Sequence, residues 1–182
     1  MGKAGASQVH PHIQLLLGSG YYPGKMGALA AAAARHTPGR DYLQDLVDLH
    51  VGLGLGMRYK SAAVIVPLNP TKDNEFMVVG TDSLLDWTWL YWLVHRTYIE
   101  ELGVFCFSQG MAMPSSVIGP GAGDTGKLMV ARLGARGDCG SPYNDVSSLE
   151  LYTLNSISTD YYATMRSYVK VFERYKGSYP QF

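Results

Sequence analysis

The residues best suited to chemistry are concentrated in one segment near the middle of the chain. Acid–base and nucleophilic catalysis use carboxylates, imidazoles and thiols, and this segment contains all three. The candidate catalytic residues are Asp82, Asp86, His95 and Cys106. Cys106 lies within an apolar run, which predicts a buried, unreactive thiol, because a nucleophilic cysteine needs a nearby cation or a helix N-terminus to lower its pKa. Catalysis by this set is therefore the alternative to a non-enzymatic interpretation, which we favour.

Aromatic side chains gather in the same segment. They are Trp87, Trp89, Tyr91 and Trp92. Pockets for small molecules are lined mostly by apolar and aromatic side chains with a few polar groups. The alternative function is therefore a small-molecule enzyme or binding domain with a Trp/Tyr-lined pocket near Asp82, Asp86 and His95. The same aromatic residues spread around more than one face of a predicted helix, which also suits a helix buried in the domain or against a partner.

Two short motifs resemble known binding sequences but lack the context that these need. The string at 121–127 matches the first seven positions of a phosphate-binding loop, yet Leu128 replaces the required Ser or Thr and a strand is predicted to follow. Arg136, Gly137 and Asp138 form the tripeptide of integrin ligands, but Gly and Asp also suit a β-turn. We interpret both as loop sequences and expect neither nucleotide binding nor integrin contact.

The sequence also predicts neither a metal site nor a cofactor. His10 and His12 could present two imidazoles to a metal, but no acidic residue or cysteine lies near them. The chain has only two cysteines, which excludes a four-cysteine zinc module and a disulfide-dense secreted scaffold. We expect no metal and no cofactor.

Charge is balanced overall but unevenly distributed. Fifteen basic and fifteen acidic residues cancel, while residues 1–40 carry four positive charges net, 161–182 carry three, and 41–160 carry seven negative charges. Basic ends and an acidic centre suit attraction between copies of the chain, and they also suit contact with nucleic acid. The basic residues near the C-terminus, which are interleaved with aromatic residues as in some single-strand binders, are Arg166, Lys170, Arg174 and Lys176. Ordinary solvated charge is the third interpretation.

Three helices are predicted before residue 103. The alanine-rich segment 25–36 favours a helix because alanine is the best helix former. Apolar residues recur at three- and four-residue spacing over 41–53, with acidic residues opposite. A third helix, 83–102, opens with Ser83 as its cap and Asp86 three residues on.

The remaining regular elements are predicted to be strands, apart from an ambiguous C-terminal segment. Apolar runs bounded by turn residues predict strands over 61–66, 76–79, 104–108, 127–133 and 149–157. Residues 161–176 fit both a helical stripe and an alternating strand. A strand of that length would exceed the usual 3–10 residues, so we favour a helix.

These elements predict an α+β fold. We expect a single domain over 24–182, with a mixed or antiparallel sheet, two to four helices, and an extended N-terminal arm over 1–23. No run approaches the ~20 apolar residues of a membrane-spanning helix, and no signal peptide is evident. We therefore expect a soluble chain that does not enter a membrane, and we leave its location open, with the virion as one candidate.

Composition favours a structural role. Charged residues make up 16% of the chain and aromatic residues 12%, and glycine and tyrosine are abundant. A chain with few charges and many aromatic residues suits burial of much of its surface against copies of itself. The predicted function is a structural self-assembling subunit, such as a capsid, tail or other virion-like component. Its main partner would be copies of itself, and nucleic acid would be a candidate partner at the basic ends.

Overall fold

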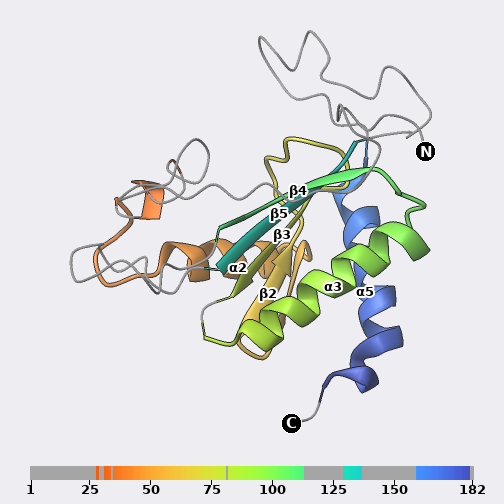
Figure 1. Ribbon diagram of the computed structural model, residues 1–182. Helices are drawn as coiled ribbons and strands as arrows, with labels where there is room; N and C mark the ends of the chain where they lie inside the picture. Colours follow the sequence, from red (N-terminus) through yellow and green to blue (C-terminus); the bar gives the residue numbers. More distant parts are fainter. Residues whose placement is uncertain are drawn as a thin grey trace, which may run out of the picture.

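The computed structural model describes residues 28, 31–33, 35–80, 82–112, 129–136 and 159–180. Within these residues, an antiparallel sheet of five strands packs against helices on both of its faces (Figure 1). The α+β fold with an antiparallel sheet, as the sequence predicts, is confirmed. The predicted N-terminal arm over 1–23 and the predicted strand over 149–157 lie outside the described residues.

Each described α-helix starts where the sequence supplies a capping side chain. The helices are α2 (Tyr42–Gly52), α3 (Leu84–Glu100) and α5 (Tyr161–Tyr175), and a 3-10 turn, η1 (Lys176–Ser178), follows α5. The capping residues are Asp41, Ser83 and Asp160, whose side-chain oxygens accept hydrogen bonds from backbone N–H groups of the first turn. The preference for a helix in the C-terminal segment is thus confirmed. Residues 28 and 31–33 are helical as well.

The strands form one sheet, in which one strand, β5, lies between two strands that precede it in the sequence. They are β1 (Gly56–Tyr59), β2 (Ala62–Ile65), β3 (Phe76–Gly80), β4 (Phe107–Ala112) and β5 (Met129–Ala135). Their spatial order is β1-β2-β3-β5-β4, and each neighbouring pair is antiparallel. The chain makes a three-stranded meander, passes through α3, and then places β5 between β3 and β4. In the described part of the sheet, β1 and β4 are therefore the edge strands.

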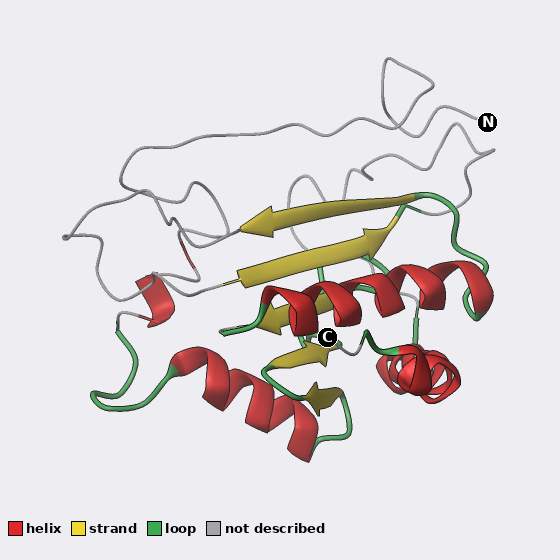
Figure 2. Ribbon diagram, turned by 60° about the horizontal axis from the view of Figure 1, so that its bottom comes forward, coloured by secondary structure: helices red, strands yellow, loops and turns green. Residues whose placement is uncertain are grey.

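The core lies in two layers because successive strand residues point to opposite faces. Val78 of β3 and Ala131 of β5 are paired and belong to the layer that packs against α3 and α5. Val79 and Val130 are also paired and belong to the layer that packs against α2. Figure 2 shows α5 nearly end-on beside α3. The buried helix predicted from the aromatic segment is therefore α3, at the centre of the larger layer.

Two strand predictions were wrong in detail. β1 was not predicted, because its residues follow a glycine-rich stretch that looks like the end of a helix. The strand predicted over 104–108 begins instead at Phe107 and continues to Ala112. Phe105 is 70% exposed, so the apolar run before β4 is not a buried strand. Within the described residues, none of the helices has both the length and the apolar character needed to cross a membrane.

Candidate functional site

In the described part of the chain, β4 forms an edge of the sheet, because no described strand pairs with its outer side. In the described part of the chain it pairs with β5 alone, from Phe107 opposite Ala135 to Ala112 opposite Val130. The four residues 108–111 are exposed. An edge strand presents backbone N–H and C=O groups along its outer side, and these can pair with a strand of another molecule.

The side chains of β4 do not protect this edge. Proteins usually blunt an edge strand with lysine or other charges, or with proline. The sequence of β4 is Phe-Ser-Gln-Gly-Met-Ala, which has none of these. The opposite edge differs, because Arg58 of β1 donates hydrogen bonds to Gln44 and Asp48 of α2. A charged side chain and a helix thus accompany β1, whereas β4 is uncharged.

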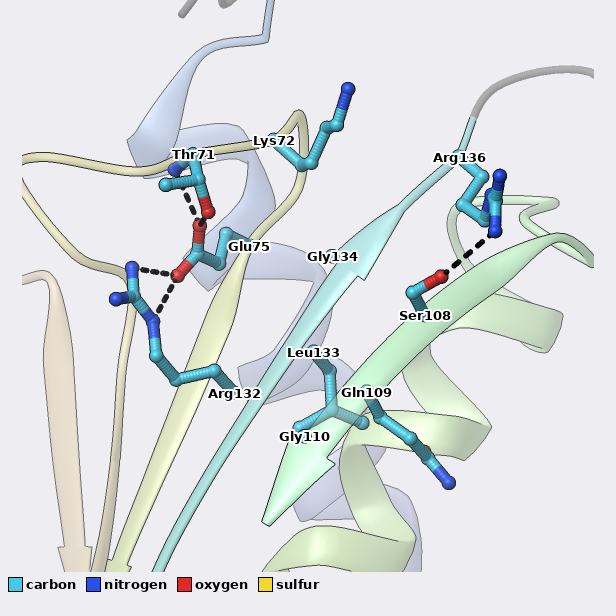
Figure 3. Close-up of a pocket in the computed structure, with 10 residues that line it drawn as sticks. All are labelled: Thr71, Lys72, Glu75, Ser108, Gln109, Gly110, Arg132, Leu133, Gly134 and Arg136. Atoms are coloured by element: carbon cyan, nitrogen blue, oxygen red, sulfur yellow. Dashed lines mark hydrogen bonds and ion pairs between the residues drawn. The ribbon is translucent and has the colours of Figure 1, made fainter. Parts of the chain in front are cut away.

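A cavity of about 340 Å³ lies next to β4 (Figure 3). It is on the sheet face to which Arg132 and Gly134 point, which is the face that α2 covers further along. Its charged lining residues are Lys72, Glu75, Arg132 and Arg136. Lys72 and Glu75 come from the segment between β2 and β3, Arg132 comes from the second half of β5, and Arg136 directly follows β5. Among the lining residues that the structure describes, three are basic and one is acidic.

Glu75 shapes one wall of this cavity. It is 3% exposed, and its Oε2 accepts hydrogen bonds from the backbone N–H of Thr71 at 2.5 Å and from the Thr71 hydroxyl at 2.7 Å. Its Oε1 accepts from Nε of Arg132 at 2.6 Å and pairs with Nη2 of the same guanidinium. A buried carboxylate needs such compensation. Glu75 thus holds the Arg132 side chain against the wall (Figure 3).

Two glycines border the cavity, and their surroundings differ. Gly110 of β4 lies opposite Arg132 in the register, and a Cβ added there would meet no atom within 4 Å. Gly134 lies between Arg132 and Arg136, and a Cβ added there would stand 2.9 Å from Cβ of Lys72. Glycine in a strand interior often marks a site where another group approaches the backbone closely. No described atom occupies the position above Gly110, whereas the lysine stem occupies the position above Gly134.

The aromatic residues considered for a pocket differ in their surroundings. Trp87 is buried, its Nε1 donates to the carbonyl of Val78 at 3.2 Å, and its ring stacks on Tyr91. Trp89 is buried and stacks on Trp92. None of the four lines the cavity beside β4. Trp87 and Trp89 belong to the core layer between α3, the sheet and α5, Tyr91 packs against it, and Trp92 is 37% exposed.

Asp86 joins the start of α3 to two other segments. Its carboxylate accepts hydrogen bonds from the backbone N–H of Ser61 at 3.2 Å, from the Ser61 hydroxyl at 2.7 Å and from the Tyr179 hydroxyl. Burial tends to raise the pKa of Asp86, but these hydrogen bonds outweigh it and lower the pKa below its ordinary value of 3.8. The hydrogen bond to Asp86 in turn raises the pKa of Tyr179 to about 12. These contacts are those of an anchoring residue.

The other candidate catalytic residues do not assemble around Asp86. His95 lies nine residues further along α3, about 13 Å along the helix axis, so the two side chains are too far apart for direct proton transfer. The His95 ring contacts the Tyr91 carbonyl at 2.9 Å and the Gln109 side chain at 2.8 Å. Asp82 lies directly before the cap residue of α3.

Cys106 requires a correction. It is buried, as the apolar run around it predicts, but it is disulfide-bonded and therefore not a thiol. A disulfide sulfur cannot serve as the thiolate nucleophile that the catalytic interpretation needs. The other cysteine of the chain, Cys139, lies outside the described residues.

The basic residues near the C-terminus each pair with an acid of the same chain. The ion pairs are Arg166–Asp160, Lys170–Glu101, Arg174–Glu100, Arg174–Glu101 and Lys176–Glu173. Three of the five connect α5 to the end of α3. Part of the attraction between the basic end and the acidic centre of the chain is therefore satisfied within one molecule.

The short motifs contribute one residue to the described site. Arg136 lines the cavity, and its Nη1 donates to the Ser108 hydroxyl at 3.3 Å. Gly137 and Asp138, the string at 121–127, and the histidines near the N-terminus lie outside the described residues. Where the structure describes the chain, no group of three or more His, Cys, Asp or Glu residues is arranged to hold a metal ion.

The sequence matches no protein-family model, and no curated protein is significantly similar to it. The described residues define an α+β fold with an uncharged edge strand, β4, and a cavity beside it that is lined in part by charged side chains. The function of the chain has to be inferred from these two features.

Sequence reasoning did not find the cavity. Glu75 and Arg132 are 57 positions apart, so no local pattern connects them. The sequence contains one weak indication of the cavity. Gly110 and Gly134 interrupt segments that are otherwise suited to strands, and a glycine within a strand can mark a place where another group approaches the backbone closely.

Proposed function

We propose that this chain is a structural, self-assembling subunit and that β4 is the edge through which two copies pair. The observation that carries this proposal is an exposed edge strand without charge or proline. Antiparallel pairing of β4 with β4 of a second copy would join two five-stranded sheets across a twofold axis. A capsid or tail subunit of a virus particle is one example of this class.

The chemistry around β4 supports this arrangement. The strand has six residues, or about 20 Å, which allows a continuous ladder of backbone hydrogen bonds. Because it is uncharged, two copies can approach without repulsion between directly facing side chains. Met111 is 47% exposed, and Phe105, two residues before the strand, is 70% exposed. Burial of these apolar side chains would add to the backbone pairing.

Light scattering behind a sizing column, over a range of protein concentrations, tests the proposal. The unaltered chain should have the mass of two or more subunits of 19.9 kDa. Met111→Lys should shift the mass towards one subunit, because lysine on an edge strand disfavours edge-to-edge pairing. The substitution is at an exposed position, so the fold itself should tolerate it.

The matched control is Leu49→Lys, which puts the same charge at an exposed apolar position of α2 (53% exposed). Its mass should equal that of the unaltered chain. A monomer at every concentration tested, or an oligomer of unchanged mass in Met111→Lys, would contradict pairing through β4. A matching mass loss in both variants would point to a general effect of charge.

A further inference from the structure

We infer that a second interaction site of this chain, at the start of α3, binds a tyrosine side chain and can accept it from the segment 176–180 of another copy. In the structure, Tyr179 of the same chain occupies this site, which we call the tyrosine site. After α5, the chain turns toward the end of the molecule at which α3 starts (Figure 1). The residues that contact Tyr179 and form the tyrosine site are Tyr59, Lys60, Asp86 and Trp89. None of them belongs to β4, so the inference does not depend on pairing through that strand.

The tyrosine site contacts both the hydroxyl and the ring of its occupant. The Tyr179 hydroxyl donates a hydrogen bond to the carboxylate of Asp86, a residue that is only 6% exposed. The ammonium group of Lys60 lies 3.5 Å from the centroid of the Tyr179 ring. The rings of Tyr59 and Trp89 meet the same ring edge-to-face, at centroid distances of 5.5 and 5.7 Å. Because a hydrogen bond to a charged group and a cation–π contact both depend on geometry, the site selects an aromatic side chain with a hydroxyl.

Two walls of the tyrosine site are held in place by contacts that do not involve Tyr179. Asp86 also accepts hydrogen bonds from the backbone N–H and the hydroxyl of Ser61. The indole of Trp89 stacks on that of Trp92, at a centroid distance of 5.0 Å. The site should therefore keep its shape when its occupant leaves, as a binding site for an exchangeable segment must.

The segment that carries Tyr179 lies mostly at the surface. Residues 176–178 are exposed, and η1 buries none of its residues. A Cβ added at Gly177 would meet no atom within 4 Å, so this position is not packed against the rest of the chain. The segment can therefore leave the tyrosine site without disturbing α5. A second copy offers it the same contacts, and exchange of an identical element between copies costs little free energy.

Fluorescence anisotropy of a dye-labelled peptide with the sequence of residues 176–182 tests the site. The peptide should bind the full chain that carries Tyr179→Ala, in which the tyrosine site is vacant. It should bind the unaltered chain at least tenfold more weakly, because Tyr179 of the chain itself competes for the site. A peptide with phenylalanine in place of its tyrosine should bind the Tyr179→Ala chain roughly tenfold more weakly, because it cannot donate to Asp86.

Two further variants probe the walls and the fold. Lys60→Gln, combined with Tyr179→Ala, should weaken peptide binding about threefold, because the cation over the ring is lost. If Tyr179→Ala does not fold, Tyr179→Phe keeps the ring and loses only the hydroxyl. That variant should bind the peptide more tightly than the unaltered chain does, because its own segment competes less well.

Two control variants of the Tyr179→Ala chain should leave the affinity for the peptide unchanged. Lys170→Gln removes an exposed lysine of α5 that pairs with Glu101, outside the tyrosine site. Met111→Lys alters the β4 edge and so separates this site from pairing through β4. No binding to the Tyr179→Ala chain, equal binding to the unaltered chain, or equal binding of the phenylalanine peptide would overturn the inference.

Photo-cross-linking tests exchange between copies. Chains with a benzophenone-bearing phenylalanine at position 179 are mixed with unaltered chains labelled with a heavy nitrogen isotope, irradiated and digested. Mass spectrometry should find cross-links from position 179 to residues 59–61 or 86–89 of a labelled chain. Cross-links confined to the unlabelled chain would contradict exchange and leave the proposed pairing through β4 intact. A protein that remains monomeric without the peptide, and whose Tyr179→Ala variant binds it, would contradict that pairing and leave the tyrosine site intact.

Discussion

Gly80 shows how one residue without a side chain can set the packing of a helix on a sheet. It ends β3 beneath Trp87, and a Cβ at this position would stand 2.8 Å from Cδ1 of the indole and 3.0 Å from its Cβ. Both contacts are closer than packed carbon atoms tolerate. Trp87 is fixed in turn by its hydrogen bond to Val78, so it has little freedom to move away.

We therefore expect Gly80→Ala to destabilise the protein by about 1–3 kcal/mol, the usual cost of overpacking a core. The free energy of unfolding in urea measures this. Gly110→Ala is the control, because its added Cβ meets open space. Equal unfolding midpoints for the two variants would show that the indole can shift at no cost.

The ion pair of Glu75 and Arg132 makes a second prediction at this scale. Arg132→Met would leave a buried carboxylate without its cation and should lower the free energy of unfolding by about 1.5–3 kcal/mol. Replacing both partners, as Glu75→Leu with Arg132→Met, should restore part of that loss, because no buried charge remains. Denaturant unfolding of the single and double variants measures this coupling. A double variant less stable than the single one would contradict it.

At the scale of the element, capping residues made the helices predictable from the sequence. Ser83 and the acid three residues after it indicated the start of α3, and the structure shows the Ser83 hydroxyl accepting the expected N–H. β4 was less predictable, because the apolar residues before it indicated a buried strand, whereas Phe105 is exposed. The exposure of a side chain depends on which distant segments cover it, and a local pattern contains no such information.

The contact between α3 and α5 predicts a response to acid. Burial tends to raise the pKa of Glu100, but hydrogen bonds from Tyr175 and Arg174 outweigh it and lower the pKa below the ordinary value of 4.5. A carboxyl group whose pKa is lowered by folding stabilises the protein fully above its unfolded value. This stabilisation is lost as the pH falls through the lower, folded value.

Glu100→Gln should therefore be less stable than the unaltered chain at neutral pH, and the difference should shrink on acidification below about pH 4.5. Urea unfolding at a series of pH values measures this difference. Glu173→Gln, at an exposed acid on α5, should show a much smaller dependence. A stability difference for Glu100→Gln that stays constant down to pH 3 would contradict the assignment.

At the scale of the whole molecule, the fold class could be predicted from the sequence. The role of the unevenly distributed charges could not be predicted, because it depends on which charged residues lie close together in the folded chain. Periodicity and caps identify elements one at a time, and an antiparallel α+β arrangement follows from their mixture. The basic C-terminal helix, however, pairs with the acids at the end of α3, for example through Arg174 and Glu101. Its charges serve contacts inside the molecule, and only the folded arrangement reveals this.

The disulfide at Cys106 affects the stability of the whole chain. We expect Cys106 in the denatured, unreduced chain not to react with a thiol reagent, because Cys106 is disulfide-bonded. Reduction should lower the free energy of unfolding by about 2–4 kcal/mol, since the cross-link restricts the unfolded chain. Thiol titration and thermal unfolding with and without reductant measure both effects. Two reactive thiols before reduction would contradict the disulfide.

The location of the tryptophans on α3 determines which part of the protein its intrinsic fluorescence reports on. All the tryptophans of the chain, Trp87, Trp89 and Trp92, lie on this helix, and Trp89 and Trp92 are stacked on each other. Intrinsic tryptophan fluorescence therefore reports on the layer of α3 and α5, and a change in emission marks the loosening of that layer. Events at the β4 edge or in the cavity need a different probe, such as a dye attached near Met111. The two signals together would show whether the helices and the open edge unfold in one step.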